Sequence, residues 1–213
     1  MTILETDIVA AFDTETTGVD PSIDRVRSIG IVLGTLKDGI SSRISLLVDT
    51  KGVSSSPDAL AVHKIPDNMT GGIPLEDAVA AMQALIGTRA KIAHNARFDI
   101  DMIIANLTRD GKESHIPAFL QTPCIDTMTM AKERFPGSRV NLDSLSKLCG
   151  ITLHKAARQG RHDATEDAEL AFMCWRQMNT KNDLFGSSNS KQNTDQPPND
   201  DTPPPINSVE LNW

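Results

Sequence analysis

A chain of 213 residues, 39% of them hydrophobic, is long enough for one ordinary domain and can bury a sizeable core. Its formal net charge of −7 argues against a protein that holds nucleic acid over a broad basic surface, so a nucleic-acid substrate must be gripped locally. The sequence has no apolar run that could span a bilayer, no signal-peptide pattern and no paired cysteine spacing, so we expect a cytoplasmic protein without membrane contact.

Apolar runs and turn residues predict strands and helices along the first 180 residues. We expect strands over residues 6–13, 27–36, 42–49 and 90–95. We expect helices over residues 56–65, 74–87, 96–111, 127–135, 142–150 and 164–178. Pro74 is expected at the first position of its helix, where its missing N–H costs nothing. Strands that come first and then alternate with helices predict an α/β fold, in which helices cover a mixed sheet.

The composition changes sharply near residue 180. Residues 181–213 contain five prolines and six asparagines but no apolar run that could form a core. Such a segment cannot bury enough apolar surface to offset the entropy of ordering it, so we predict that it is disordered. We therefore expect one folded domain over residues 1–180 and a tail over 181–213 that could bind a partner.

Two carboxylates close the first predicted strand, in the stretch FDTETTG. Asp13 and Glu15 are two positions apart, so their side chains leave the strand on the same face. Neighbouring carboxylates both stay ionised when a cation lies between them, and Mg²⁺ or Mn²⁺ prefers such oxygen ligands. For an isolated pair, a solvent-facing strand end is the simpler interpretation. The turn formed by Thr16, Thr17 and Gly18 favours a site, because it can offer hydroxyls and N–H groups to an anion.

A second acidic group begins the last predicted helix, in the stretch HDATEDA. Asp163 and Glu166 have the spacing of a capping box, which starts the helix at Ala164 and puts Asp167 in its first turn. His162 then lies just outside the helix beside a fixed carboxylate, where an imidazole can act as a general base. Taken alone, the stretch is explained more simply by a loop histidine and a helix-start charge stabilised by the helix dipole.

Three short motifs in a fixed order carry a family resemblance. DxETTG, HNxxFD and HxAxxDA, within about residues 8–175, resemble the three exonuclease motifs of the DEDD superfamily, in its histidine-containing branch (DEDDh). LAVHKI and ERFPGSRVNLDSLSKLCGI are most similar to the epsilon proofreading subunits of bacterial DNA polymerase III. That family implies a ribonuclease H-like fold, a mixed sheet with helices on both faces.

The resemblance also implies a function and a set of site residues. It implies a 3′→5′ exonuclease that uses two divalent metal ions, Mg²⁺ or Mn²⁺, to release nucleoside 5′-monophosphates from DNA 3′ ends. Single-stranded or mismatched ends are the expected substrates, in proofreading or repair. The implied catalytic residues are the metal ligands Asp13, Glu15, Asp99 and Asp167 and the general base His162. The residues implied to line the pocket for the terminal nucleotide are Thr16, His63, Asn95 and Phe98.

Two other functions stay open from the sequence alone. An RNA 3′→5′ exonuclease of the tRNA-trimming or oligoribonuclease type would share all five catalytic residues. A catalytically silent nucleic-acid-binding module would not need all five of them. Residues 181–185, KNDLF, weakly resemble the peptides that bind bacterial sliding clamps, so a polymerase or a clamp is the partner to test for the tail.

Overall fold

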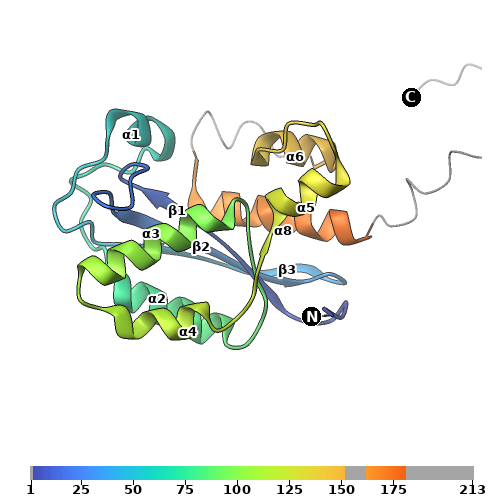
Figure 1. Cartoon of the computed structure of the whole chain (residues 1–213), viewed down its shortest axis with the longest axis horizontal. Helices are drawn as coiled ribbons and strands as arrows, with labels where there is room; N and C mark the ends of the chain where they lie inside the picture. Colours follow the sequence, from blue (N-terminus) through green and yellow to red (C-terminus); the bar gives the residue numbers. More distant parts are fainter. Residues whose placement is uncertain (1, 152–161, 181–213) are drawn as a thin grey trace, which may run out of the picture. The chain divides into compact units, whose positions relative to one another are not determined.

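The computed structural model describes residues 2–151 and 162–180 of the chain. Within them, a five-stranded sheet carries helices on both of its faces (Figure 1). The strands are β1 (Val9–Thr16), β2 (Val26–Thr35), β3 (Gly39–Leu47), β4 (Lys91–Ala93) and β5 (Cys124–Asp126). Their order is β3-β2-β1-β4-β5, with antiparallel pairing on the β3 side of β1 and parallel pairing on the β5 side. The predicted mixed sheet is confirmed, and the tail predicted over 181–213 lies outside the described residues.

Two groups of helices cover the two faces of the sheet. The helical elements are α1 (Pro57–His63), α2 (Leu75–Ile86), α3 (Ala96–Arg109), the 3₁₀ turn η1 (Glu113–His115), α4 (Ile116–Leu120), α5 (Thr127–Arg134), α6 (Leu142–Leu148) and α8 (Ala164–Thr180). Helices α2, α3 and α4 bury their apolar side chains on one face, and α8 buries Phe172 and Trp175 on the other. Helices α5 and α6 pack against α8. Among the described helices, none has the length and apolar character to cross a membrane.

The central strand β1 supplies side chains to both cores. Ala10 and Phe12 belong to the core under α2 and α3, whereas Val9 and Ala11 belong to the core under α8. This alternation follows from the period of two along a strand. All four side chains are almost fully buried, and burial of apolar surface contributes about 25 cal/mol per Å². The register of β1 is therefore fixed, and it decides on which face each residue of FDTETTG lies.

The predicted elements agree with the structure in most places. Four strands and six helices begin and end within about three residues of their predicted bounds. The sequence does not predict β5, η1 or α4, which have three to five residues, although it does predict the three-residue strand β4 from its apolar run. The prediction for Pro74 is wrong by one position. Its ψ of 144° is extended, so Pro74 caps α2 and Leu75 is the first helical residue.

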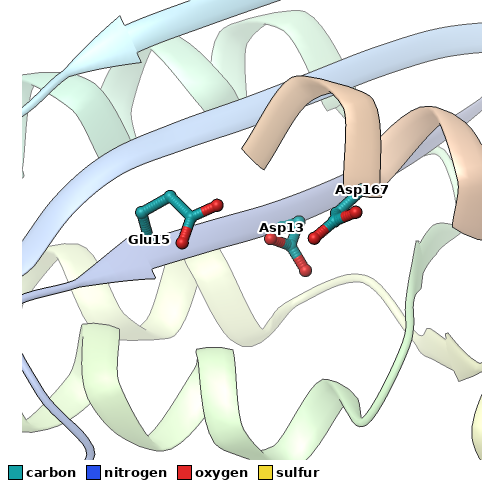
Figure 2. Close-up of side chains that lie close together, drawn as sticks. All are labelled: Asp13, Glu15 and Asp167. Carbon is teal, nitrogen blue, oxygen red and sulfur yellow. The ribbon is translucent and has the colours of Figure 1, made fainter. Parts of the chain in front are cut away.

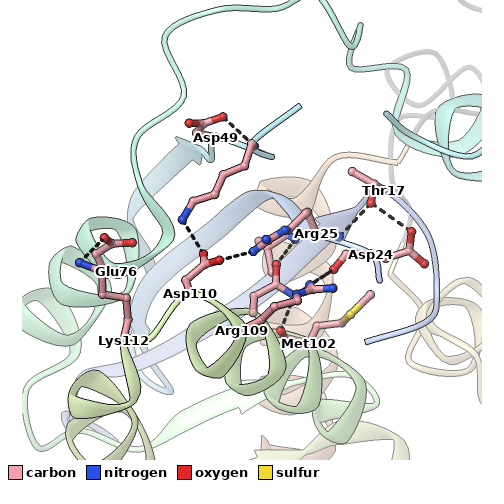
Figure 3. A network of polar contacts seen from close by, with 12 residues as sticks. Thr17, Asp24, Arg25, Asp49, Glu76, Met102, Arg109, Asp110 and Lys112 are labelled. Carbon is pink, nitrogen blue, oxygen red and sulfur yellow. Dashed lines mark hydrogen bonds and ion pairs between the residues drawn. The ribbon is translucent and has the colours of Figure 1, made fainter. Parts of the chain in front are cut away.

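A polar network holds the loop after β1 against the end of α3 (Figure 3). The Arg109 guanidinium donates to the carbonyl oxygens of Ser22 and Asp24, at 2.6 and 2.5 Å. Arg25 donates to the Asp110 carboxylate at 2.8 Å, and both side chains are largely shielded from water. Shielded ion pairs are screened less than exposed ones, so this contact fixes the loop more firmly than a surface pair would. The loop that follows the DxETTG stretch therefore has a defined place beside α3.

Candidate active site

Asp13 and Glu15 lie near the end of β1, on the face that carries α8. Their odd positions continue the row of Val9 and Ala11, which pack under α8. Glu15 is buried and Asp13 is half-buried. The sequence prediction that these two side chains leave the strand on one face agrees with the sheet register.

The start of α8 brings a third carboxylate to this face. Asp163 caps the helix, and its carboxylate accepts the N–H groups of Thr165 at 2.9 Å and Glu166 at 3.3 Å. The first turn lies directly on Gly30 of β2, the residue paired with Asp13 in the sheet. A Cβ at Gly30 would lie 2.2 Å from the backbone of Ala164 and Thr165. Glycine at position 30 therefore allows α8 to begin close to Asp13.

Asp13, Glu15 and Asp167 form a three-carboxylate group (Figure 2). One oxygen of each carboxylate lies within 4.8 Å of the others, and Asp167, like Glu15, is buried. Figure 2 shows Asp13 and Glu15 rising from the strand and Asp167 reaching them from the helix. Carboxylates this close repel one another unless a cation lies among them. Hard oxygen donors from three anionic side chains fit a divalent ion such as Mg²⁺ or Mn²⁺.

His162 contacts this group through Asp167. Its Nδ1 lies 2.9 Å from Asp167 Oδ2, and its backbone N–H donates to the carbonyl oxygen of Val62 at the end of α1, also at 2.9 Å. The imidazole is 42% exposed, whereas the Asp167 side chain is 8% exposed. The ring is thus held by a buried carboxylate and remains accessible from solvent. The predicted pairing of an imidazole with a fixed carboxylate corresponds to a direct contact.

Asp99 lies on the opposite face of β1, in the first turn of α3. Its Oδ1 accepts two hydrogen bonds from Thr14, from the backbone N–H at 3.0 Å and from Oγ1 at 2.7 Å. Burial raises the pKa of the Asp99 carboxyl to about 7, although the hydrogen bonds from Thr14 act in the opposite direction. Asp99 lies outside the three-carboxylate group, and it is Asp167 that joins Asp13 and Glu15 there.

Two of the predicted pocket residues, Thr16 and His63, are buried. Thr16 Oγ1 donates to the carbonyl oxygen of Gly18 at 2.6 Å, so this hydroxyl serves the turn itself. His63 Nδ1 accepts the N–H of Ile65 at 2.8 Å, which places the ring proton on Nε2. Burial lowers the pKa of His63, and the nearby Arg27 guanidinium lowers it further. The neutral ring thus has one buried donor, Nε2–H, for which the described residues provide no acceptor.

The other two predicted pocket residues lie at the start of α3. Asn95 is exposed and has a left-handed backbone with φ of 62°, which asparagine adopts more readily than most residues. Its N–H donates to Asp126 Oδ1 at 3.0 Å, which ties the HNxxFD stretch to the cap of α5. Phe98 is half-buried and packs against the core under α3. The structure thus gives each of the two a structural contact, and their nucleotide-binding role stays a prediction.

Most of the sequence matches an enzyme family. Residues 10–173 match the sequence model of the family described as exonuclease (RNase_T). The chain belongs to the exonuclease family. This match confirms the resemblance to exonucleases stated above.

Individual relatives of this exonuclease-family chain are replication proteins. It is 32% identical over 166 residues to the DNA polymerase III subunit epsilon of Treponema pallidum, covering 76% of this chain and 72% of that protein. It is 32% identical over 181 residues to the PolC-type DNA polymerase III of Clostridium perfringens, covering 84% of this chain but only 12% of that protein.

A solved structure shares the fold. The zinc-bound complex of E. coli exonuclease I with single-stranded DNA superposes with a TM-score of 0.66, at 16% identity, covering 83% of this chain and 41% of that one. The chain thus spans less than half of exonuclease I and a small part of the PolC-type polymerase. The ribonuclease H-like fold expected from the sequence is confirmed.

Two residues of the candidate site are missing from the sequence prediction. Thr14 stands between the two carboxylates of the first motif, and the strand period alone would have directed it to the opposite face. Gly30 stands inside a strand, where glycine often marks the close approach of another backbone. Neither pattern predicts which residue is contacted, because Asp99, the partner of Thr14, and Ala164, the neighbour of Gly30, lie far away in the sequence.

Proposed function

We propose that this chain is a metal-dependent 3′→5′ exonuclease that releases nucleoside 5′-monophosphates from DNA 3′ ends. The observation that carries the proposal is the three-carboxylate group with His162 attached to it through Asp167. A site with clustered anionic oxygens and an accessible imidazole suits hydrolysis of a phosphodiester, in which a water must lose a proton beside a charged phosphate.

Two divalent cations, Mg²⁺ or Mn²⁺, are the proposed cofactors. Asp13, Glu15 and Asp167 are the proposed ligands on the α8 face, and Asp99 is the proposed fourth ligand. When bound, such ions lower the pKa of a coordinated water and neutralise charge that develops on the phosphate and the leaving oxygen. In the metal-free protein, the carboxylates repel one another, and this repulsion favours the binding of a cation.

His162 is the proposed general base. An ionised Asp167 carboxylate can only accept a hydrogen bond, so His162 donates from Nδ1. In the neutral ring, the lone pair is then on Nε2, which can accept a proton from the attacking water. The contact between the His162 backbone and Val62 fixes the position of the loop that carries this ring. Asp167 thus has two proposed roles, as a metal ligand and as the group that orients His162.

The proposed terminal-nucleotide pocket contains Thr16, His63, Asn95 and Phe98. The buried Nε2–H of His63 supports this, since a buried donor without an acceptor in the described chain gains a hydrogen bond when a polar ligand binds. The exposed amide of Asn95 at the start of α3 can reach a ligand without losing a contact that holds the fold.

DNA is the proposed substrate, preferably single-stranded or mismatched. Two relatives are named as parts of DNA polymerase III, and exonuclease I was crystallised with single-stranded DNA. These names also support a place in proofreading or repair beside a polymerase. The net charge of −7 favours a substrate held at one end over a duplex held along its length.

Digestion of 5′-labelled oligonucleotides tests the proposal. Single-stranded DNA, a matched RNA and a primer-template with a mismatched 3′ end are each incubated with Mg²⁺ and with EDTA. We expect a ladder that shortens from the 3′ end, fastest on single-stranded or mismatched DNA, and no reaction in EDTA. Faster loss of RNA would move the function to the RNA exonucleases, and shortening from the 5′ end or activity in EDTA would contradict the proposal.

A further inference from the structure

Thr14 lies between Asp13 and Glu15 in the chain but faces the opposite side of β1. Its neighbours in sequence point toward α8, whereas its own hydroxyl contacts Asp99 on α3. Thr14 is 6% exposed and Asp99 is 2% exposed. The middle residue of the first motif therefore touches the carboxylate of the second motif, 85 positions later in the chain.

The backbone of Thr14 contacts Asp99 on the β4 side of β1, beyond the point where β4 ends. Strand β4 pairs with β1 at Ala10 and Ala11, and the Ala10 N–H donates to Ala90 on that side at 3.1 Å. Amide groups at every second residue of a strand point the same way, so the Thr14 N–H points to this side as well. Asp99 accepts it at 3.0 Å, beyond the end of β4. The carboxylate thus takes the place of a strand partner.

The Thr14 hydroxyl adds a second donor to the same oxygen. It donates to Asp99 Oδ1 at 2.7 Å, the usual distance for a hydroxyl hydrogen bond. With one hydrogen bond, a carboxylate can still rotate about that bond. Two donors that approach the same oxygen from different directions restrict this rotation and fix the plane of the carboxylate. Because both bonds are made to Oδ1, Thr14 does not engage Oδ2.

We propose that Thr14 is a positioning residue whose hydroxyl orients Asp99, so that Oδ2 is presented to a divalent cation. The inference rests on the proposed function, because it assumes that Asp99 is a metal ligand. Every residue type except proline could supply the backbone donor, but only a hydroxyl side chain at position 14 supplies the second. Both groups are buried, so water cannot replace a lost donor without opening the structure.

Titration of the metal-free protein with Mn²⁺ alone, followed by calorimetry, tests this role. Thr14→Val keeps the shape of the side chain and removes the hydroxyl. We expect this variant to bind Mn²⁺ roughly 10–100-fold more weakly at the site to which Asp99 contributes. Thr14→Ser restores a hydroxyl and should bind Mn²⁺ within a few-fold of the wild type. Thr14→Ala provides the same comparison if the valine variant does not fold.

Thr122→Val is the matched control. Thr122 is also a buried threonine, but its Oγ1 has no hydrogen-bond partner among the described residues, so its loss should leave Mn²⁺ binding unchanged. A second control repeats Thr14→Val in an Asp99→Asn background, where the substitution should have almost no further effect on Mn²⁺ affinity. An equal loss in both backgrounds would show that Thr14 acts by another route and would overturn the inference.

The remaining outcomes separate the inference from the proposed function. The wild type and Thr14→Val could have the same Mn²⁺ affinity and the same rate of DNA degradation. In that case the inference fails and the proposed function stands. A Thr14→Ser variant as weak as Thr14→Val would also overturn it, because the hydroxyl would not be the cause. If the wild type binds no Mn²⁺, the proposed function and the inference fail together.

Discussion

The carboxylates on the two faces of β1 have different surroundings. On the α8 face, Asp13, Glu15 and Asp167 crowd together within 4.8 Å. On the α3 face, Asp99 stands apart and receives two hydrogen bonds from Thr14. Carboxylates that gather need a cation to neutralise their charge, whereas a single buried carboxyl group can be satisfied by hydrogen-bond donors of the fold. A single strand can therefore build both arrangements, because consecutive side chains point to opposite faces.

The largest expected effect tests the α8 face of β1, which holds Asp13, Glu15 and Asp167 and is called the crowded face below. Asp13→Ala or Asp167→Ala each removes a proposed metal ligand and should lower the rate of DNA degradation by more than about 10⁴-fold, since bound ions supply several kcal/mol of transition-state stabilisation. The fold should remain, because each change also removes a repulsive charge. Rates at saturating Mg²⁺ and urea unfolding in EDTA measure the two effects. Wild-type activity in either variant would remove that residue from the metal site.

His162 should matter less than the metal ligands it contacts. His162→Ala removes the proposed base but no metal ligand, so the rate should fall by roughly 10²–10⁴-fold while Mn²⁺ still binds. His115→Ala is the matched control, because His115 is another partly exposed histidine, in η1 beside α2 and α3. Single-turnover rates and Mn²⁺ titrations of both variants decide the point. A His162→Ala enzyme as fast as the His115→Ala enzyme would assign the base to another group.

Gly30 tests whether the crowded face depends on the approach of α8. A methyl group at position 30 would meet the α8 backbone at 2.2 Å, so the first turn of the helix must move away from β2. We expect Gly30→Ala to lower stability by about 1–3 kcal/mol and the rate by about 10²-fold, since displacement of a catalytic group by 1 Å can have that effect. Urea unfolding and steady-state rates measure both. Unchanged Mn²⁺ affinity and rate would mean that α8 is not placed by this contact.

The last prediction concerns the isolated carboxylate, Asp99, and its effect is on stability and not on the rate. The pKa of Asp99 is raised to about 7 in the folded protein, so its contribution to stability is present below about pH 4 and is lost as the pH rises to about 7. Asp99→Asn keeps an acceptor for Thr14 and cannot ionise. In EDTA, the variant should therefore gain stability relative to the wild type as the pH rises from 4 to 8.

Urea unfolding of both proteins at several pH values measures that difference. Thr14 contacts only the Oδ1 position, which asparagine retains, so the packing of α3 should be the same in both proteins. A stability difference that does not change with pH would show that Asp99 ionises as readily in the fold as in the unfolded chain.

The sequence predicts the crowded face better than the isolated one. Asp13 and Glu15 share a strand, and Asp163 marks the start of α8, so local rules place two carboxylates on one face of β1 and put Asp167 in the first turn of a helix. The contact between Thr14 and Asp99 spans 85 positions and depends on where β4 ends, which no local pattern contains. The same limit applies to Gly30, whose role appears only when α8 is placed on β2.

Some short elements, β5 among them, escape prediction for a related reason. Strand β5 has three residues and lies at the edge of the sheet, where pairing with β4 defines it. Its Asp126 is nevertheless predictable as the cap of α5, because it accepts the N–H of Met128 two positions later. A contact between residues within one helical turn, such as a helix cap, can thus be predicted from the sequence. A strand that is defined by its pairing with another strand cannot.

Anomalous diffraction from crystals soaked in Mn²⁺ tests the central claim most directly. The crowded face is claimed to be a metal site, formed by Asp13, Glu15 and Asp167. We predict a strong manganese peak at about 2.1–2.3 Å from an oxygen of each of these three carboxylates, between the oxygen distances usual for Mg²⁺ and Ca²⁺. Manganese bound elsewhere, with the three carboxylates occupied only by water or by one another, would contradict the claim.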